Sequence, residues 1–133
     1  MDYYYDERLV PYIKSFQSDM GLYYVPIDPP RKLVIGNGIE FDSEDTIAYC
    51  EGNYGIIKVW ERWWNTASEM EKKWVLYHEM GHWLGLPHYT AELDIMNDQL
   101  PDCSSLPEVA WRLLVHNLFN PGRRETCCSS TKQ

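Results

Sequence analysis

One eleven-residue stretch, HEMGHWLGLPH, limits most strongly how this chain can fold. It follows the pattern H-E-x-x-H-x-x-G-x-x-H, in which three histidines, one glutamate and one glycine have fixed spacings. Residues four apart on an α-helix share a face, so His78 and His82 predict a helix that presents both imidazoles to one point. Gly85 can adopt the left-handed conformation that ends a helix, and Pro87 cannot continue one. The chain can therefore reverse after Gly85 and return His88 to the same point.

Three converging histidines form a donor set that is typical of zinc. Neutral imidazoles at three corners of a tetrahedral ion leave one position for water, which is the mark of a catalytic site rather than a closed structural one. Glu79 follows the first of these histidines, where a carboxylate can accept a proton from that water. We therefore predict that His78, His82 and His88 are zinc ligands and that Glu79 is the general base and acid.

The motif, together with Asp94-Ile95-Met96-Asn97 downstream, resembles the metzincin clan of zinc metallopeptidases. In that clan a tight turn carrying a methionine, the Met-turn, lies beneath the three-histidine site as an apolar floor. The resemblance implies that Met96 is this floor and that Gly85 is the turn residue. The Leu-Gly-Leu-Pro-His ending looks most like the matrixin-type branch, in a compact single-domain form. Tyr89 and Asp98 depart from the residues common in the subfamilies, so the subfamily is left open.

The order of elements matches the layout that the resemblance implies. We expect an α+β fold with a small, twisted, mostly parallel sheet that has an edge strand. The sheet packs on an N-terminal helix and an active-site helix, which are followed by the Met-turn and a C-terminal helix. One catalytic domain is expected over residues 1–120. Residues 121–133 are polar and small, which favours a flexible tail.

Hydrophobic periodicity and turn residues place the individual elements before the motif. The first helix is expected from Pro11 to Gly21, with a buried stripe of Leu9, Ile13, Phe16 and Met20. Strands are expected at Lys32–Ile35, Thr46–Cys50 and Ile56–Trp60, with shorter extended pieces at Leu22–Val25 and Ile39–Phe41. Turn signals are Gly36-Asn37-Gly38 and Gly52-Asn53-Tyr54-Gly55.

Two further helices are predicted around and after the motif. The central helix begins near Ser68, which forms a capping box with Glu71, or near Thr66, which pairs with Glu69 in the same way. It is apolar nearly all round, so it is expected to be buried. A last helix carries Leu106, Val109, Ala110, Leu113, Leu114 and Leu118 at helical spacing and ends at Asn120-Pro121-Gly122.

Charge and hydropathy exclude two classes of partner. The formal net charge of −8 disfavours nucleic acid, whose phosphates require a basic surface. No apolar run approaches the length of a membrane span. The first residues show no basic and apolar leader, so the protein either stays where it is made or begins after a removed signal. A peptide or protein substrate and a monomer are the expectation.

The four cysteines, the fourth histidine and two groups of aromatic residues are interpreted as structural. Cys50, Cys103, Cys127 and Cys128 lack C-x-x-C spacing, which argues against a cysteine zinc site. Cys50 is expected in a buried strand and the last pair in the tail. His116 shares a polar face with Arg112 and is expected in solvent, not at the metal. For Trp60, Trp63 and Trp64 we favour packing over a substrate groove, and for Tyr3-Tyr4-Tyr5 a frayed terminus over a latency segment.

These predictions favour a zinc-dependent endopeptidase that uses a zinc-bound water assisted by Glu79. An extended peptide is expected to pair with an edge strand, for which Thr46–Cys50 is the candidate. Residues Asn97–Pro101 are expected to wall the pocket for the residue after the scissile bond. The alternative is an idle zinc-site protein that binds peptides or a partner through the cleft. Glu79 argues against it, because binding a metal needs only the histidines.

Overall fold

The computed structural model describes residues 3–22, 30–36, 47–51, 55–90 and 93–120, to which all structural statements refer. The elements in chain order are β1 (Tyr4–Tyr5), α1 (Val10–Leu22), β2 (Lys32–Gly36), β3 (Ala48–Glu51), β4 (Ile56–Trp60), α2 (Glu61–Thr66), α3 (Glu69–Trp83) and α4 (Glu108–Leu118). The predicted α+β fold is confirmed. No helix in these ranges is long and apolar enough to cross a membrane.

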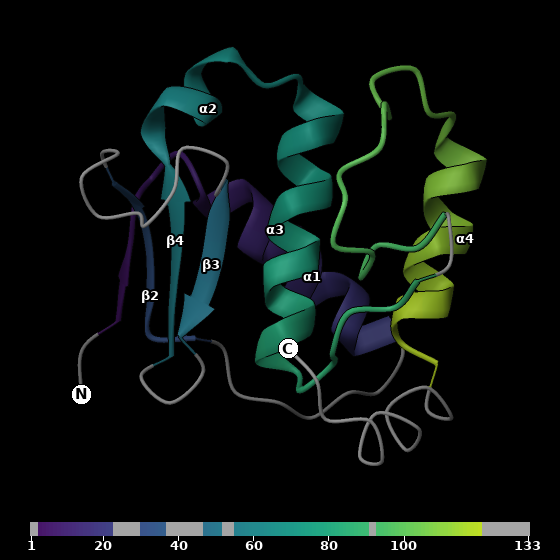
Figure 1. Cartoon of the computed structure of the whole chain (residues 1–133). Helices are drawn as coiled ribbons and strands as arrows, with labels where there is room; N and C mark the ends of the chain where they lie inside the picture. The colour runs from purple at the N-terminus through teal and green to yellow at the C-terminus, as the bar shows by residue number, and fades with distance from the viewer. Residues whose placement is uncertain (1–2, 23–29, 37–46, 52–54, 91–92, 121–133) are drawn as a thin grey trace.

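The described strands form one sheet in the order β1-β2-β4-β3. β1 pairs with β2 and β2 with β4 in parallel, whereas β3 pairs antiparallel with β4. The sheet is therefore mostly parallel, as predicted, and β3 is an edge strand among the described strands. Figure 1 shows α3 between this sheet and α4, with α1 behind α3.

Aromatic side chains join the three long helices. Tyr77 on α3 contacts Phe16 of α1, with ring centroids 4.9 Å apart. On the other side it contacts Trp111 of α4, with centroids 5.0 Å apart. The predicted stripe of α1 is buried throughout: Leu9, Ile13, Phe16 and Met20. α3 is consequently buried from its middle to near its end, and Trp74, Val75, His78 and Glu79 on one of its faces line a cleft.

Local signals at both ends of α1 and at the start of α3 agree with the structure to within about a residue. The capping box at α3 is present: Ser68 N donates to Glu71 Oε1 at 2.7 Å, and Glu71 N donates to Ser68 Oγ at 3.2 Å. The alternative start at Thr66 is not used, because Thr66 ends the separate short helix α2. α1 begins at Val10 and passes Gly21 to end at Leu22.

The expectation of a frayed N-terminus is wrong. Tyr4 and Tyr5 form β1, in which Tyr4 N donates to Arg31 O and Asp6 N donates to Leu33 O, both at 2.8 Å. The open edge of β2 supplies these acceptors, and tyrosine suits a half-buried strand position. Two residues are too short for a hydrophobic pattern to reveal.

The predicted apolar stripe of α4 is partly wrong. Val109 and Leu113 are 77% and 62% exposed, respectively. Leu114 and Leu118 of the predicted stripe are buried, and the same face also contains Trp111 and Val115. Apolar residues occupy both faces of this helix, and the face that carries the largest side chain, Trp111, packs against Tyr77.

The short helix α2 was not predicted, although the packing interpretation of its aromatic residues is supported. Trp64 is buried, and its ring meets Tyr12 edge-to-face with centroids 5.4 Å apart. Trp63 packs against the core from a half-buried position. Several predictions fall outside the described residues: most of Leu22–Val25, Ile39–Phe41, the turns beyond Gly36 and before Gly55, and the tail with Cys127 and Cys128.

Candidate metal centre and cleft

Helix α3 ends in a conformation that brings the third histidine back beside the first two. Gly85 has a φ of +97°, in the left-handed region expected for it. Gly85 N donates to His82 O at 2.9 Å and Leu86 N donates to Gly81 O at 3.0 Å. This pair of hydrogen bonds is the Schellman motif, which satisfies the last carbonyls of a helix and turns the chain. Two residues further on, His88 faces the helix again.

The three imidazoles meet at a spacing suited to one metal ion. The Nε2 atom of His88 lies 3.2 Å from that of His82 and 3.2 Å from that of His78. Two nitrogens bound to one tetrahedral zinc at its usual bond length are about 3.3–3.4 Å apart. All three donor atoms lie within 4.8 Å of one another. Within the described part of the chain, no aspartate, glutamate or cysteine joins this cluster.

Backbone carbonyls orient two of these rings. His78 Nδ1 lies 2.6 Å from Ile95 O, and His82 Nδ1 lies 2.8 Å from Leu86 O. A carbonyl only accepts, so each Nδ1 carries the proton and each Nε2 keeps its lone pair for a ligand. Burial lowers the pKa of His78 to about 4 and that of His82 below its usual range. Both rings are therefore neutral at neutral pH.

This donor arrangement fits a divalent cation. Neutral rings whose Nε2 lone pairs face one another at 3.2 Å repel unless a cation lies between them, and His88 can donate to only one neighbour. Zinc is commonly bound by three histidine nitrogens, and here helix α3 and the turn after it fix the positions of all three. The residues present therefore fit the metal that the motif predicted.

Glu79 lies beside this cluster in a buried position. Its side chain is 6% exposed, and its Oε1 atom has no hydrogen-bond partner among the described residues. Burial raises the pKa of Glu79 to about 8. A cation beside such a carboxyl group would favour its charged form, which can accept a proton and return it.

Met96, for which the sequence predicts the floor of the site, lies in a tight turn. Its side chain is fully buried. Asp94 Oδ1 accepts a hydrogen bond from Met96 N at 2.8 Å, and Asp94 O accepts one from Asn97 N at 3.0 Å, which close a tight turn. Tyr89 N donates to Met96 O at 3.0 Å and so ties the segment after His88 to this turn.

Asp94 belongs to the sequence motif, and in the structure its side chain caps the turn by accepting from Met96 N. An aspartate two residues before a turn amide is a known signal for a side-chain-capped turn, and it could have been identified. The carbonyls of Ile95 and Leu86 carry no comparable signal, because any residue provides a carbonyl. Their role depends on where the fold brings the backbone of these two residues.

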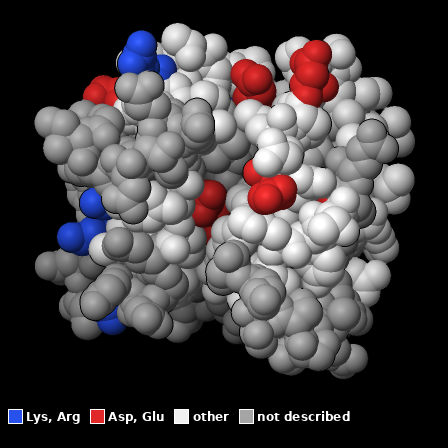
Figure 2. Space-filling view, viewed as in Figure 1, with Lys and Arg blue, Asp and Glu red and all other residues white. Residues whose placement is uncertain are grey.

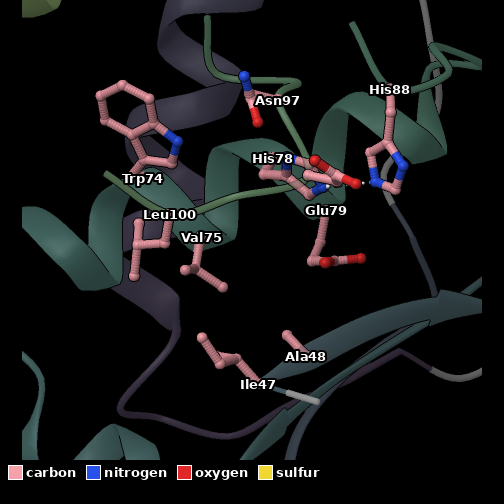
Figure 3. Close-up of a pocket in the computed structure, with 10 residues that line it drawn as sticks. Ile47, Ala48, Trp74, Val75, His78, Glu79, His88, Asn97 and Leu100 are labelled. Atoms are coloured by element: carbon pink, nitrogen blue, oxygen red, sulfur yellow. Dashed lines mark hydrogen bonds between the residues drawn. The ribbon is translucent and has the colours of Figure 1, made fainter. Parts of the chain in front are cut away.

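A cleft of about 260 Å³ opens beside the histidines. The lining residues come from β3 and the residue before it, from α3, from the segment that follows α3, and from the segment after Met96: Ile47, Ala48, Trp74, Val75, His78, Glu79, His88, Asn97, Asp98 and Leu100. Figure 3 shows Ile47 and Ala48 on one side, with Asn97 and Leu100 across from them. The predicted edge strand and the predicted wall after the Met-turn thus border the same cleft.

The described charges are unevenly distributed over the face that carries the cleft. Figure 2 shows acidic side chains in and beside a central hollow, whereas the lysines and arginines visible on this face lie on the sheet side. None of the ten lining residues is a lysine or an arginine. The cleft is therefore apolar and acidic.

Two residues that the sequence placed outside the site lie outside it. His116 is exposed on α4 and does not belong to the histidine cluster. Cys103 is a buried thiol whose pKa is raised to about 11 by burial. Cys50 is in β3, as predicted, but it is half-buried rather than buried.

A comparison with protein families gives one match. The family model described as matrixin, of the M10 peptidases, matches residues 28–107. This range contains β2, β3 and β4, the whole of α3, and the turn at Met96, and it ends directly before α4. No curated protein and no solved structure matches the chain.

Proposed function

Because the chain belongs to the matrixin family of metallopeptidases, we propose that it is a zinc-dependent endopeptidase. His78, His82 and His88 hold the metal, and Glu79 transfers the proton. The observation that carries this proposal is that the Nε2 atoms of His78 and His82 each lie 3.2 Å from that of His88, next to a buried carboxyl oxygen that has no partner among the described residues.

The chain's own residues divide the chemistry among them. When bound, zinc supplies Lewis acidity, which activates water and stabilises negative charge on a carbonyl oxygen. Glu79 accepts the proton of the attacking water at its carboxylate and delivers it to the leaving amine. The carbonyls of Ile95 and Leu86 hold two of the rings in the tautomer that binds metal.

The edge position of β3 supports a mode of substrate binding. An extended peptide can add to an exposed strand edge through backbone hydrogen bonds. β3 pairs with β4 on one side only among the described strands, and Ala48 lines the cleft. We infer that the peptide lies along β3, and that the residue after its scissile bond enters the cleft between Val75 and Leu100.

Cleavage of a quenched peptide library tests the proposal. The zinc-loaded wild type should cut a subset of the peptides, and Glu79→Ala should lose at least about 100-fold in rate, because general acid–base catalysis contributes that much or more. Metal analysis should give about one zinc per chain for both proteins. If wild type and variant bind zinc equally and neither cuts any peptide, the idle binding protein replaces the peptidase.

A further inference from the structure

Trp74 places a hydrogen-bond donor at the cleft that nothing in the described structure uses. The side chain lies on α3, is 1% exposed and lines the cleft. Its Nε1 atom is buried without a hydrogen-bond partner among the described residues. Figure 3 shows the indole nitrogen on the side of the ring toward His78 and Asn97.

This donor lies at the end of the cleft away from His88. Val75 and Leu100 are apolar lining residues on that side, Asn97 lies beside the indole, and Ile47 lies across the cleft. A buried N–H without a partner destabilises a protein, and a ligand atom that accepts from it recovers part of this loss. A donor that no protein group uses therefore discriminates between substrate side chains of similar shape.

Trp111 provides an internal comparison. Its Nε1 atom is also buried without a partner among the described residues, and the residue is 0% exposed. Its ring centroid lies 6.1 Å from that of Trp74, but Trp111 does not line the cleft. Of these two unpaired indoles, only Trp74 can meet a group that enters from the cleft.

The charges of the cleft restrict the acceptor. Asp98 is a lining residue, and its carboxylate disfavours an anionic side chain there. Glutamine has an apolar stem and a neutral terminal carbonyl. We propose that Trp74 donates a hydrogen bond to the substrate side chain after the scissile bond, and that the enzyme prefers glutamine at this position over apolar or anionic residues. This inference rests on the proposed peptidase function.

Kinetics on matched peptides test the preference. Three peptides differ only in the residue after the scissile bond, which is glutamine, glutamate or norleucine. For each peptide, kcat/KM is measured with zinc-loaded wild type, Trp74→Phe and Trp111→Phe. The ratio of glutamine to norleucine should fall about two- to tenfold in Trp74→Phe, the range of one neutral hydrogen bond. It should keep the wild-type value in Trp111→Phe, which loses an unpaired indole outside the cleft. An unchanged ratio in Trp74→Phe would overturn the inference.

An NMR experiment tests the same donor without turnover. In protein with ¹⁵N-labelled tryptophan, the indole resonance of Trp74 is the one that disappears in Trp74→Phe. A product peptide beginning with glutamine should move it downfield, and a norleucine-led peptide should not. A shift without cleavage of any peptide would support the donor and overturn the peptidase. Cleavage with neither shift nor altered preference would overturn the donor alone.

Discussion

Gly81 and Met96 are in such close contact that a Cβ atom on Gly81 would lie 2.3 Å from Met96 Sδ. Gly81 lies in the last turn of α3 between two of the histidines, and Met96 is in the turn below them. The residue before Met96, Ile95, supplies the carbonyl that holds His78. The absence of a side chain at Gly81 therefore sets how closely this turn, and with it one proposed ligand, approaches the helix.

Gly81→Ala is expected to destabilise the protein and weaken zinc binding. The added methyl group must displace a buried sulfur, and overpacking of this kind costs about 1–3 kcal/mol. Displacing Met96 also moves the Ile95 carbonyl, and loss of such a support lowers metal affinity about 10–100-fold. Urea unfolding and competition for zinc with a chromophoric chelator measure the two effects.

Gly21→Ala is the matched control for this substitution. Gly21 lies in α1, and a Cβ atom there would meet nothing within 4 Å. Alanine in a helix is more stable than glycine by about 1 kcal/mol, so this variant should be at least as stable as wild type and bind zinc unchanged. If both variants lose stability equally, the contact with Met96 is not the cause.

Gly85→Ala tests the reversal of the chain after α3. Gly85 has a φ of +97°, which a residue with a Cβ atom adopts at a cost of about 1–2 kcal/mol. The strain acts three residues before His88, so zinc affinity should fall together with the unfolding free energy. Gly85→Asn should lose less of both, because asparagine tolerates this conformation better. Equal losses in the two variants would argue against backbone strain.

The parts of the site that sequence could predict are those fixed by spacing along one helix or by the conformation of one residue. His78 and His82 are one helical turn apart, and Gly85 and Ser68 mark the end and the start of that helix through well-known local chemistry. Each of these signals is contained within about four residues. The structure places each of them as the spacing required.

The features that escaped prediction depend on which surface a segment meets. Leu113 and Leu114 are equally apolar, but only Leu114 lies on the buried face of α4 with Trp111, which packs against Tyr77. β1 exists because β2 offers it a free edge, and two tyrosines alone contain no such information. The contact between Gly81 and Met96 likewise joins residues whose proximity no local pattern reveals.

Asp94 should stabilise the Met-turn through its side chain. Asp94 is 4% exposed, and its Oδ1 atom accepts from Met96 N at 2.8 Å. Asp94→Ala leaves this buried amide without that acceptor, which costs about 1–3 kcal/mol in the free energy of unfolding. Asp94→Asn keeps an oxygen at the same place and should lose less than half as much. Urea titrations of the three proteins measure this, and equal loss in both variants would show that the negative charge matters more than the hydrogen bond.

His88→Ala should separate metal binding from the fold. His88 is exposed and follows α3, so its removal leaves the buried core intact. Only two of the three imidazoles remain, and zinc affinity should fall by more than about 100-fold, beyond the effect of losing a supporting residue.

In wild type, zinc at about 100 times its dissociation constant adds about 2.7 kcal/mol of stability, and chelation should remove it. His88→Ala should start near the chelated wild type in thermal unfolding, while His116→Ala, altered on the exposed face of α4, should respond to zinc as wild type does. A zinc-dependent rise in Tm that survives in His88→Ala would remove this residue from the metal centre.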